Sequence, residues 1–214
     1  MADYSLYLVT DSALSRGRSA LEIVDAAISG GVTMVQYREK SASTRAMLEE
    51  ATALAALCRS RGVPFIVNDR ADLALAVGAD GLHVGQDDLP APAARRIIGR
   101  GKLLGVSAGN LVEARRAAAE GADYVGASPV FSTPTKPDAP PPMGLDGLAA
   151  LARGIGIPVV AIGGINARNA AALIGAGAAG LAVVSAIVSA DDVEAASREL
   201  RAIIDGAKGG KHDH

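Results

Sequence analysis

The feature that most constrains this chain is a short apolar run that recurs eight times, separated by amphipathic or alanine-rich stretches. Continuous apolar runs of this length are typical of strands buried on both faces, as in parallel sheets. We expect strands at Leu6–Thr10, Thr33–Tyr37, Pro64–Asn68, Gly81–Gly85, Leu103–Ser107, Tyr124–Ser128, Pro158–Ile162 and Gly180–Val184.

The intervening stretches have helical patterns. One follows Asn110, a good N-cap residue, and stops at Gly121. A weak internal repeat supports alternation, because GGVTMVQ, VGADGLHVG, EGADYVGAS and AGAAGLAVV each read as a helix end, a glycine turn and a buried strand. Consecutive strand–helix units imply parallel strands with right-handed crossovers.

Eight such units predict an α/β fold of the (β/α)8 TIM-barrel type, with one domain over residues 1–208 and a disordered tail over 209–214. The main alternative is an open doubly wound sheet. That fold more often carries G-x-G-x-x-G after its first strand, whereas here the first strand leads into TDSAL.

Composition narrows the classes of function. Aromatic residues make up 3%, there is no Trp and the net charge is −2, which argues against a nucleic-acid partner. Cys58 is the sole cysteine, and no uncharged apolar run approaches ~18 residues, so we expect a cytoplasmic protein that does not span a membrane. The first residues do not resemble a signal peptide. His212 and His214 are expected to be solvated.

Polar side chains gather where the predicted strands end, which in such barrels is the side of the active site. Gln36, Arg38 and Lys40 alternate along QYREK, so they point the same way from an extended segment. Two cations and an amide suit a multiply charged anion such as pyrophosphate. The alternative is a solvated charged loop.

Acids follow two neighbouring strands, Asp69 after the third and Asp87–Asp88 after the fourth. Carboxylates that face each other repel unless a cation lies between them. Mg²⁺ commonly takes one or two protein carboxylates and completes its octahedron with water and phosphate oxygens. A helix cap for Asp69 and a surface turn for Asp87–Asp88 are the alternatives, and spacing does not choose between Asp87 and Asp88.

Later strand ends offer groups for a phosphate. The pair Gly163–Gly164 in VAIGGIN precedes a helix start, and amides at Val184 and Ser185 could complete an anion site. The stretch 129–142 holds six of the ten prolines together with Thr133, Thr135 and Lys136, which predicts a semi-rigid loop over the site rather than a linker.

Two other residues have structural interpretations. His83 lies within a strand run and is expected to be a packed, hydrogen-bonded core residue rather than a base. Cys58 is expected to be plain helix packing. Neither a Ser–His–Asp set nor a zinc-type Cys/His cluster is evident.

Together, the motifs QYREK, VNDRADLALAVGADGLHVGQDDL, LGVSA, FSTPTKPD, AIGGI and VVSAI, in this order over Leu6 to Ile187, resemble the thiamine-phosphate synthase family. Two departures are mild: Tyr37 stands where Leu is common, and SPVFST replaces GPVFPT. The family is a (β/α)8 barrel that couples a pyrimidinylmethyl diphosphate to a thiazole phosphate, uses Mg²⁺ and releases pyrophosphate.

The resemblance implies a role for each matching residue. Mg²⁺ would be held by Asp69 and Asp88. The pyrimidine diphosphate would be bound by Gln36, Tyr37, Arg38, Glu39, Lys40, Asn68, Ser107 and Lys136. The thiazole phosphate would be bound by Thr133, Pro134, Thr135, Gly164, Val184 and Ser185. The expected catalytic residues are Arg38, Lys40, Ser107 and Lys136.

The hypothesis is a dissociative reaction, in which the diphosphate leaves, a pyrimidine methylene cation forms and the thiazole nitrogen captures it. Two alternatives stay open: a thiazole tautomerase of the same barrel family, and a non-catalytic protein that binds thiamine phosphates. Small-molecule substrates are the expected partners. Whether the chain forms a homo-oligomer is left open.

Overall fold

Each of the predicted apolar runs forms a strand, and each observed boundary lies within one residue of its predicted position. The computed structural model describes residues 2–133 and 141–209. The strands are β1 (Leu6–Val9), β2 (Met34–Tyr37), β3 (Phe65–Asn68), β4 (Gly81–Val84), β5 (Leu103–Ala108), β6 (Tyr124–Ala127), β7 (Val159–Ile162) and β8 (Gly180–Val183).

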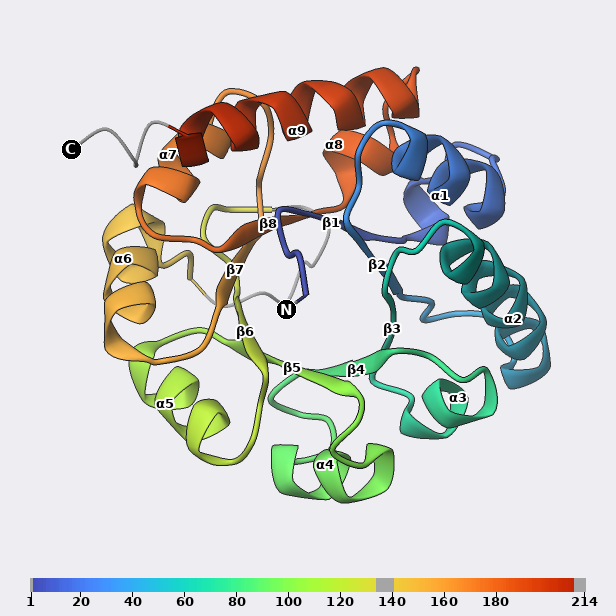
Figure 1. Cartoon of the computed structure of the whole chain (residues 1–214), viewed down its shortest axis with the longest axis horizontal. Coiled ribbons are helices and arrows are strands. Elements are labelled where there is room, and N and C mark those ends of the chain that lie inside the picture. Colours follow the sequence, from blue (N-terminus) through green and yellow to red (C-terminus); the bar gives the residue numbers. More distant parts are fainter. Residues whose placement is uncertain (1, 134–140, 210–214) are drawn as a thin grey trace.

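The strands form a closed barrel in chain order, with each strand parallel to the next and β8 paired with β1. Figure 1 shows them as an inner ring surrounded by helices. Closure removes both sheet edges, so no row of backbone groups is left unpaired. The predicted (β/α)8 barrel is therefore confirmed, and the open doubly wound sheet is excluded.

Helices follow the strands and form the outer ring (Figure 1). They are η1 (Ser12–Leu14), α1 (Ala20–Ser29), α2 (Thr44–Ser60), α3 (Ala71–Ala76), α4 (Ala91–Ile98), α5 (Leu111–Ala119), α6 (Gly144–Gly154), α7 (Ala170–Gly175), α8 (Ser185–Val188) and α9 (Val193–Gly209). Gly209, which was predicted to lie in the tail, ends α9, and residues 210–214 lie outside the described part. No helix among the described residues has the length and apolarity needed to cross a bilayer.

Local signals place several helix ends. Ser19 and Glu22 form a reciprocal capping box at the start of α1. Asn110 caps α5, as predicted, because its side chain accepts a hydrogen bond from the Glu113 N–H at 3.0 Å. Gly121 follows the end of that helix with a φ of +95°, a backbone conformation in which a side chain would be strained.

The core has two layers. The outer layer lies between strands and helices and is mostly aliphatic, with fully buried side chains such as Leu54, Leu104 and Leu148. The barrel interior holds a second cluster, which comprises Tyr4, Tyr7, Val9, Met34, Ile66, Tyr124, Val160 and Ala182.

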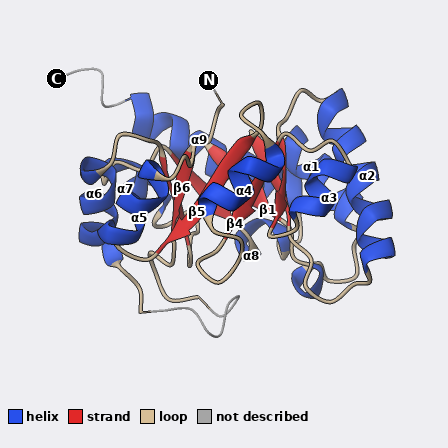
Figure 2. Cartoon of the chain, turned by 90° about the horizontal axis from the view of Figure 1, so that it is seen from below, coloured by secondary structure: helices blue, strands red, loops and turns tan. Residues whose placement is uncertain are grey.

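The two mouths of the barrel differ. The N-terminal residues lie over the ring of strands in Figure 1, and the rings of Tyr4 and Tyr124 are 5.0 Å apart, which fills this end. Figure 2 shows α8 at the opposite end, where the strands finish. Because the N-terminal residues cover only the other mouth, the loops that follow the strands can form a substrate-binding site at this end.

Candidate functional site

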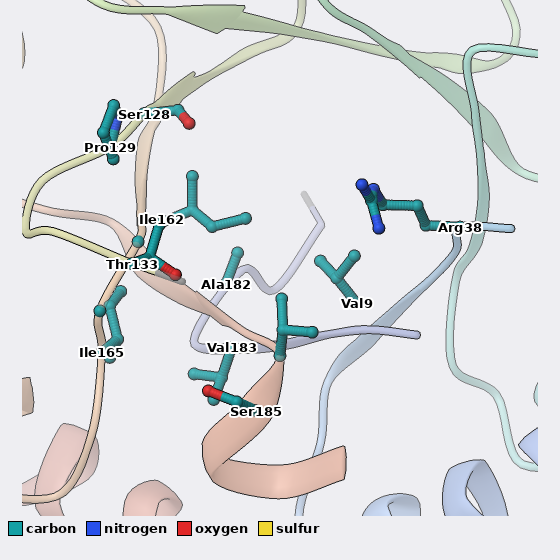
Figure 3. Close-up of a pocket in the computed structure, with 13 residues that line it drawn as sticks. Val9, Arg38, Ser128, Pro129, Thr133, Ile162, Ile165, Ala182, Val183 and Ser185 are labelled. Carbon is teal, nitrogen blue, oxygen red and sulfur yellow. The ribbon is translucent and has the colours of Figure 1, made fainter. Parts of the chain in front are cut away.

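The loops after the strands enclose a pocket of about 100 Å³, which we call the rim pocket (Figure 3). Its walls include the apolar side chains of Val9, Ile162 and Ala182. Five residues predicted to bind substrate also line it, namely Arg38, Thr133, Gly164, Val184 and Ser185. These residues come from the ends of β2, β6, β7 and β8, so barrel closure brings together positions that are far apart in the sequence.

Arg38 is held in place at the mouth of this pocket. Its Nη1 donates to Asp11 Oδ2 at 2.8 Å, and its backbone N–H donates to Thr10 Oγ1 at 2.9 Å. Figure 3 shows the guanidinium group pointing into the pocket from the side opposite Ser128 and Pro129. A partly buried arginine fixed at one edge leaves its other N–H groups for an anion.

Gly163 and Gly164 form the turn after β7, with φ values of +106° and +64°. A Cβ atom at Gly164 would lie 2.7 Å from the Ser132 carbonyl oxygen, so neither the backbone nor the space allows a side chain. The Asn169 side chain donates to the Gly164 carbonyl at 2.9 Å and stabilises the turn. Ser185 lines the same pocket as Gly164 and is the first residue of α8. The backbone N–H group of a first helical residue has no acceptor within the helix.

The segment QYREK divides between two faces, as strand alternation requires. Gln36 points into the barrel, whereas the Tyr37 hydroxyl points toward α2 and donates to Glu50 Oε2 at 2.8 Å. Tyr37 is 2% exposed, and burial followed by Glu50 raises the pKa of its hydroxyl. The structure therefore places the Tyr37 side chain away from the rim, so any substrate contact there would be made by its backbone.

Glu39 serves the loop that follows β2. Its Oε1 accepts hydrogen bonds from the Ser41 N–H at 2.6 Å and from the Ala42 N–H at 3.2 Å. Burial alone would raise the pKa of this carboxyl, but these bonds, with one from Ser12, lower it to about 2. The side chain of Glu39 thus shapes the loop that carries Lys40.

Asp69 and Asp88 come together at the ends of β3 and β4. The pKa of Asp88 is raised by partial burial and then by the neighbouring Asp69 carboxylate. Lys40 forms an ion pair with Asp69, and the Gly85 N–H donates to Asp88 Oδ2 at 2.8 Å. The predicted pair of acids is therefore adjacent, with a cation of the same predicted set beside it.

The alternative interpretation of Asp69 as a helix cap is wrong. The N-cap of α3 is Arg70, without a side-chain cap bond, and Asp72 pairs with Arg70. Asp69 instead has a φ of +61°, which is uncommon for a residue other than glycine and often marks functional sites. Asp88 does stabilise its turn by accepting a hydrogen bond from the Gly85 N–H, and both Asp87 and Asp88 are exposed.

A chain of polar side chains, which was not predicted from the sequence, crosses the barrel interior. Gln36 Nε2 donates to Tyr7 Oη at 2.9 Å, and Tyr7 Oη lies 2.9 Å from Tyr124 Oη. Tyr124 Oη lies 3.0 Å from His83 Nδ1, and His83 Nε2 lies 2.9 Å from Ser107 Oγ. These hydrogen bonds thus link two predicted substrate-binding residues, Gln36 and Ser107, through Tyr7, Tyr124 and His83, none of which was predicted to contact substrate.

His83 has the predicted structural character, because it is buried and hydrogen-bonded on both nitrogens. Burial lowers its pKa to about 4, with a small opposing effect of Asp88, so the imidazole is neutral near pH 7. The sequence did contain a signal for this polar chain, namely the alternation of inward and outward residues along each strand. Once a barrel is assumed, this alternation places Tyr7, Gln36 and His83 at inward-facing positions.

The remaining predicted residues divide into two groups. Asn68 ends β3 beside Asp69. Pro134, Thr135 and Lys136 lie outside the described residues. The rim pocket, the paired acids and Ser107 therefore form one polar rim at the carboxyl ends of the strands, with cationic, carboxylate and hydroxyl groups suited to a phosphorylated ligand.

The donor set at Asp69 and Asp88 fits a hard divalent cation, because both side chains offer carboxylate oxygens and their mutual repulsion favours a positive charge between them. Within the described part of the chain, no group of three or more His, Cys, Asp or Glu side chains is placed to hold a metal ion. A cation at this rim would therefore need water or substrate oxygens to complete its coordination.

Comparison with known proteins identifies relatives over nearly the whole chain. A family model described as thiamine monophosphate synthase matches residues 6–187. The chain is 62% identical over 204 residues to a thiamine-phosphate synthase from Chloroflexus aurantiacus, covering 95% of this chain and 94% of the relative. It is 51% identical over 209 residues to one from Moorella thermoacetica, covering 98% and 100%.

Solved structures of similar fold support the same family assignment. A thiamine phosphate pyrophosphorylase from Pyrococcus furiosus superimposes with a TM-score of 0.90 at 42% identity, covering 96% of this chain and 98% of that one. A 3-hexulose-6-phosphate synthase, with a TM-score of 0.70 at 21% identity, shares the fold. The predicted family and the predicted transferase class are confirmed: the chain belongs to the thiamine monophosphate synthase family.

Proposed function

We propose that the chain transfers a pyrimidinylmethyl group from its diphosphate to the nitrogen of a thiazole phosphate, forming thiamine phosphate and releasing pyrophosphate. The observation that carries the proposal is the arrangement of the rim. Arg38 lines the same pocket as Gly164 and Ser185, and Lys40 forms an ion pair with Asp69, one of the two paired acids. The relatives are named as thiamine-phosphate synthases, and the rim offers groups suited to two phosphorylated substrates.

Residues of the chain would bind both substrates and stabilise the charge that develops during the reaction. Arg38, already oriented by Asp11, would bind the diphosphate with its free N–H groups, and Lys40 would add a second positive charge. Both cations stabilise the negative charge that grows on the leaving group. Thr133, Gly164 and Ser185 would hold the thiazole phosphate on the opposite side of the rim pocket.

We further propose that Asp69 and Asp88 hold Mg²⁺. When bound, the metal neutralises developing charge on the diphosphate. The amino-substituted pyrimidine ring can stabilise a methylene cation, and a thiazole nitrogen held nearby can capture it. Such a reaction requires no protein nucleophile. The apolar wall formed by Val9, Ile162 and Ala182 would exclude water, which competes for the same cation.

A direct assay separates the candidate functions. The purified chain is incubated with both substrates and Mg²⁺, and product is read by fluorescence after oxidation. A synthase forms thiamine phosphate and pyrophosphate in equal amounts. A tautomerase would convert the thiazole substrate without consuming diphosphate, and a binding protein would retain added product but form none.

The metal assignment has a matched control. Asp69→Asn and Asp88→Asn are each expected to lower kcat/KM by about 100-fold or more, because oriented charge at a leaving group contributes on this scale. Asp87→Asn changes an exposed neighbour and should leave kcat/KM within about twofold. Turnover that survives in Asp69→Asn/Asp88→Asn at low Mg²⁺, with unchanged affinity for the diphosphate, would reject the assignment.

The cytoplasmic location stays a proposal, supported by the single cysteine, which is buried on the inner face of α2.

A further inference from the structure

The hydrogen bonds of the polar chain through the barrel interior run in one donor-to-acceptor direction. This direction determines whether the Ser107 hydroxyl can donate a hydrogen bond toward the rim. This inference rests on the proposed function, because it concerns how Ser107 meets the pyrimidine diphosphate. The polar chain begins at Gln36 inside the barrel, passes through Tyr7, Tyr124 and His83, and ends at Ser107 at the rim. It spans from β2 and β1 to β4 and β5, which lie across the ring in Figure 1.

Proton counting fixes the first two links. Gln36 Nε2 is a donor, so Tyr7 Oη accepts from it and must use its single proton elsewhere. Tyr124 Oη, 2.9 Å away, is the remaining acceptor. Tyr124 Oη therefore accepts from Tyr7, and its own proton is directed to His83 Nδ1 at 3.0 Å.

The last two links follow from the same proton counting, because the Tyr124 proton is directed to His83 Nδ1. His83 Nδ1 accepts from Tyr124, so the ring proton is on Nε2 and is donated to Ser107 Oγ at 2.9 Å. Ser107 Oγ thus already accepts a bond from inside the barrel. Among the described residues no other group takes its proton, so the hydroxyl is left to donate toward the rim.

The surroundings are shaped for this arrangement. A Cβ atom at Gly105 would overlap the Tyr124 ring and His83 Nδ1, and one at Gly126 would lie 3.1 Å from His83 Cε1. Glycines on β5 and β6 therefore make the room that the two rings occupy. Gln86 Nε2 donates to the Ser107 carbonyl at 2.6 Å, which holds the backbone of the same residue from outside.

Stability alone does not require such a chain. An apolar barrel interior fills space without any buried polar atoms, whereas a polar network stabilises only when every member has a partner. Within the described residues every buried side-chain nitrogen and oxygen does have one. The chain ends at a residue of the rim rather than inside the core, which points to a role in the site.

We propose that His83 is a positioning residue, held as the Nε2–H tautomer by Tyr124, which makes the Ser107 hydroxyl an obligatory donor to the bound pyrimidine diphosphate. His83 itself does not touch substrate in this proposal. It acts by occupying one lone pair of Ser107 Oγ, so the serine proton is aimed outward. The substrate acceptor then meets an oriented donor rather than a freely rotating hydroxyl.

The tautomer can be observed without any assay of activity. Long-range ¹H–¹⁵N correlation spectra of the full-length ¹⁵N-labelled chain at pH 7 distinguish the two neutral tautomers and the imidazolium form. The His83 signals are assigned by their loss in His83→Gln. We expect a protonated Nε2 and a bare Nδ1. A protonated Nδ1 overturns the proposal, even if the chain is an active synthase.

Kinetics test the positioning. His83→Gln keeps an amide donor of similar reach toward Ser107, whereas His83→Asn is too short to reach it. His83→Gln should retain kcat/KM within about threefold. His83→Asn and Ser107→Ala should each lower it about tenfold, the scale of one oriented hydrogen bond. Circular dichroism and thermal unfolding confirm that the variants are folded.

A double-variant cycle distinguishes positioning from packing. If His83 acts through Ser107, adding His83→Asn to Ser107→Ala causes no further loss. Losses that multiply in the double variant overturn the proposal, as does a His83→Asn variant with wild-type kcat/KM. If the wild-type chain forms no thiamine phosphate, the proposed function fails, and the tautomer measurement decides the hydrogen-bond direction by itself.

Discussion

The two layers of the core follow different rules, although both are fully buried. The outer layer, between strands and helices, is built from aliphatic side chains that fill volume without directional bonds. The barrel interior carries Tyr7 and Tyr124 in contact with Gln36 and His83, where hydrogen-bond geometry determines each residue. We infer that the outer layer mainly stabilises the barrel, whereas the hydrogen bonds of the interior fix the orientation of Ser107 at the rim.

The largest test of this contrast is a methyl group added to the interior. Gly105→Ala places a Cβ atom against Tyr124 and His83, and neither ring has free space into which to move. We expect a loss of at least about 3 kcal/mol in the free energy of unfolding, measured with urea. Gly156→Ala, where nothing lies within 4 Å, is the control and should change it by less than about 1 kcal/mol. Equal losses would contradict a tightly fitted interior.

A deletion in the outer layer should affect stability without affecting the rim. Leu54 of α2 is 0% exposed, and Leu54→Ala should lower the free energy of unfolding by about 3 kcal/mol through lost burial and a cavity. Val112 is 78% exposed, so Val112→Ala should change it by less than about 0.5 kcal/mol. Below the unfolding transition, both variants should keep wild-type KM values. A raised KM in Leu54→Ala would show that the outer layer also sets rim geometry.

The interior should also give the chain a distinct pH dependence. The pKa of His83 is about 4 in the folded chain, below its ordinary 6.5, so the unfolded chain takes up the proton first as pH falls. Its contribution is fully present above pH 6.5 and is lost as pH falls toward 4, by about 1 kcal/mol per pH unit. Urea unfolding between pH 7 and 5 should show a steeper loss in the wild type than in His83→Gln. Parallel curves would indicate that folding does not lower the pKa of His83.

The smallest test compares one hydroxyl in each layer. Tyr37→Phe removes a single bond to Glu50, which is partly open to water, and should cost about 1 kcal/mol or less. Tyr7→Phe leaves the buried Gln36 Nε2 without its acceptor and Tyr124 Oη with His83 as its remaining partner, and should cost about 1–3 kcal/mol. Thermal unfolding of the two variants side by side gives the order. A larger loss for Tyr37→Phe would reverse the contrast drawn between the layers.

The sequence was informative where signals are local. Each strand was placed to within one residue, because a buried parallel strand is a short apolar run bounded by turn residues. Spacing could bring Asp69 and the Asp87–Asp88 pair together, since one helix and one strand separate them and neighbouring strands end side by side. The choice of Asp88 over Asp87 came from the family resemblance. Arg38 and Gln36 could be assigned to one face by alternation, although the same rule places Tyr37 on the other, under α2.

What the tertiary structure decided is non-local. Tyr7 and Tyr124 are separated by 117 positions, and nothing in either local pattern indicates that their hydroxyls meet. Their contact needs closure of the barrel, the register of β5 against β6 and the absence of a side chain at Gly105. The apolar periodicity of the sequence therefore determined that a barrel forms and which end carries the polar residues. Hydrogen bonds across its interior depend on distances of a few tenths of an ångström, and only packing of the complete barrel sets such distances.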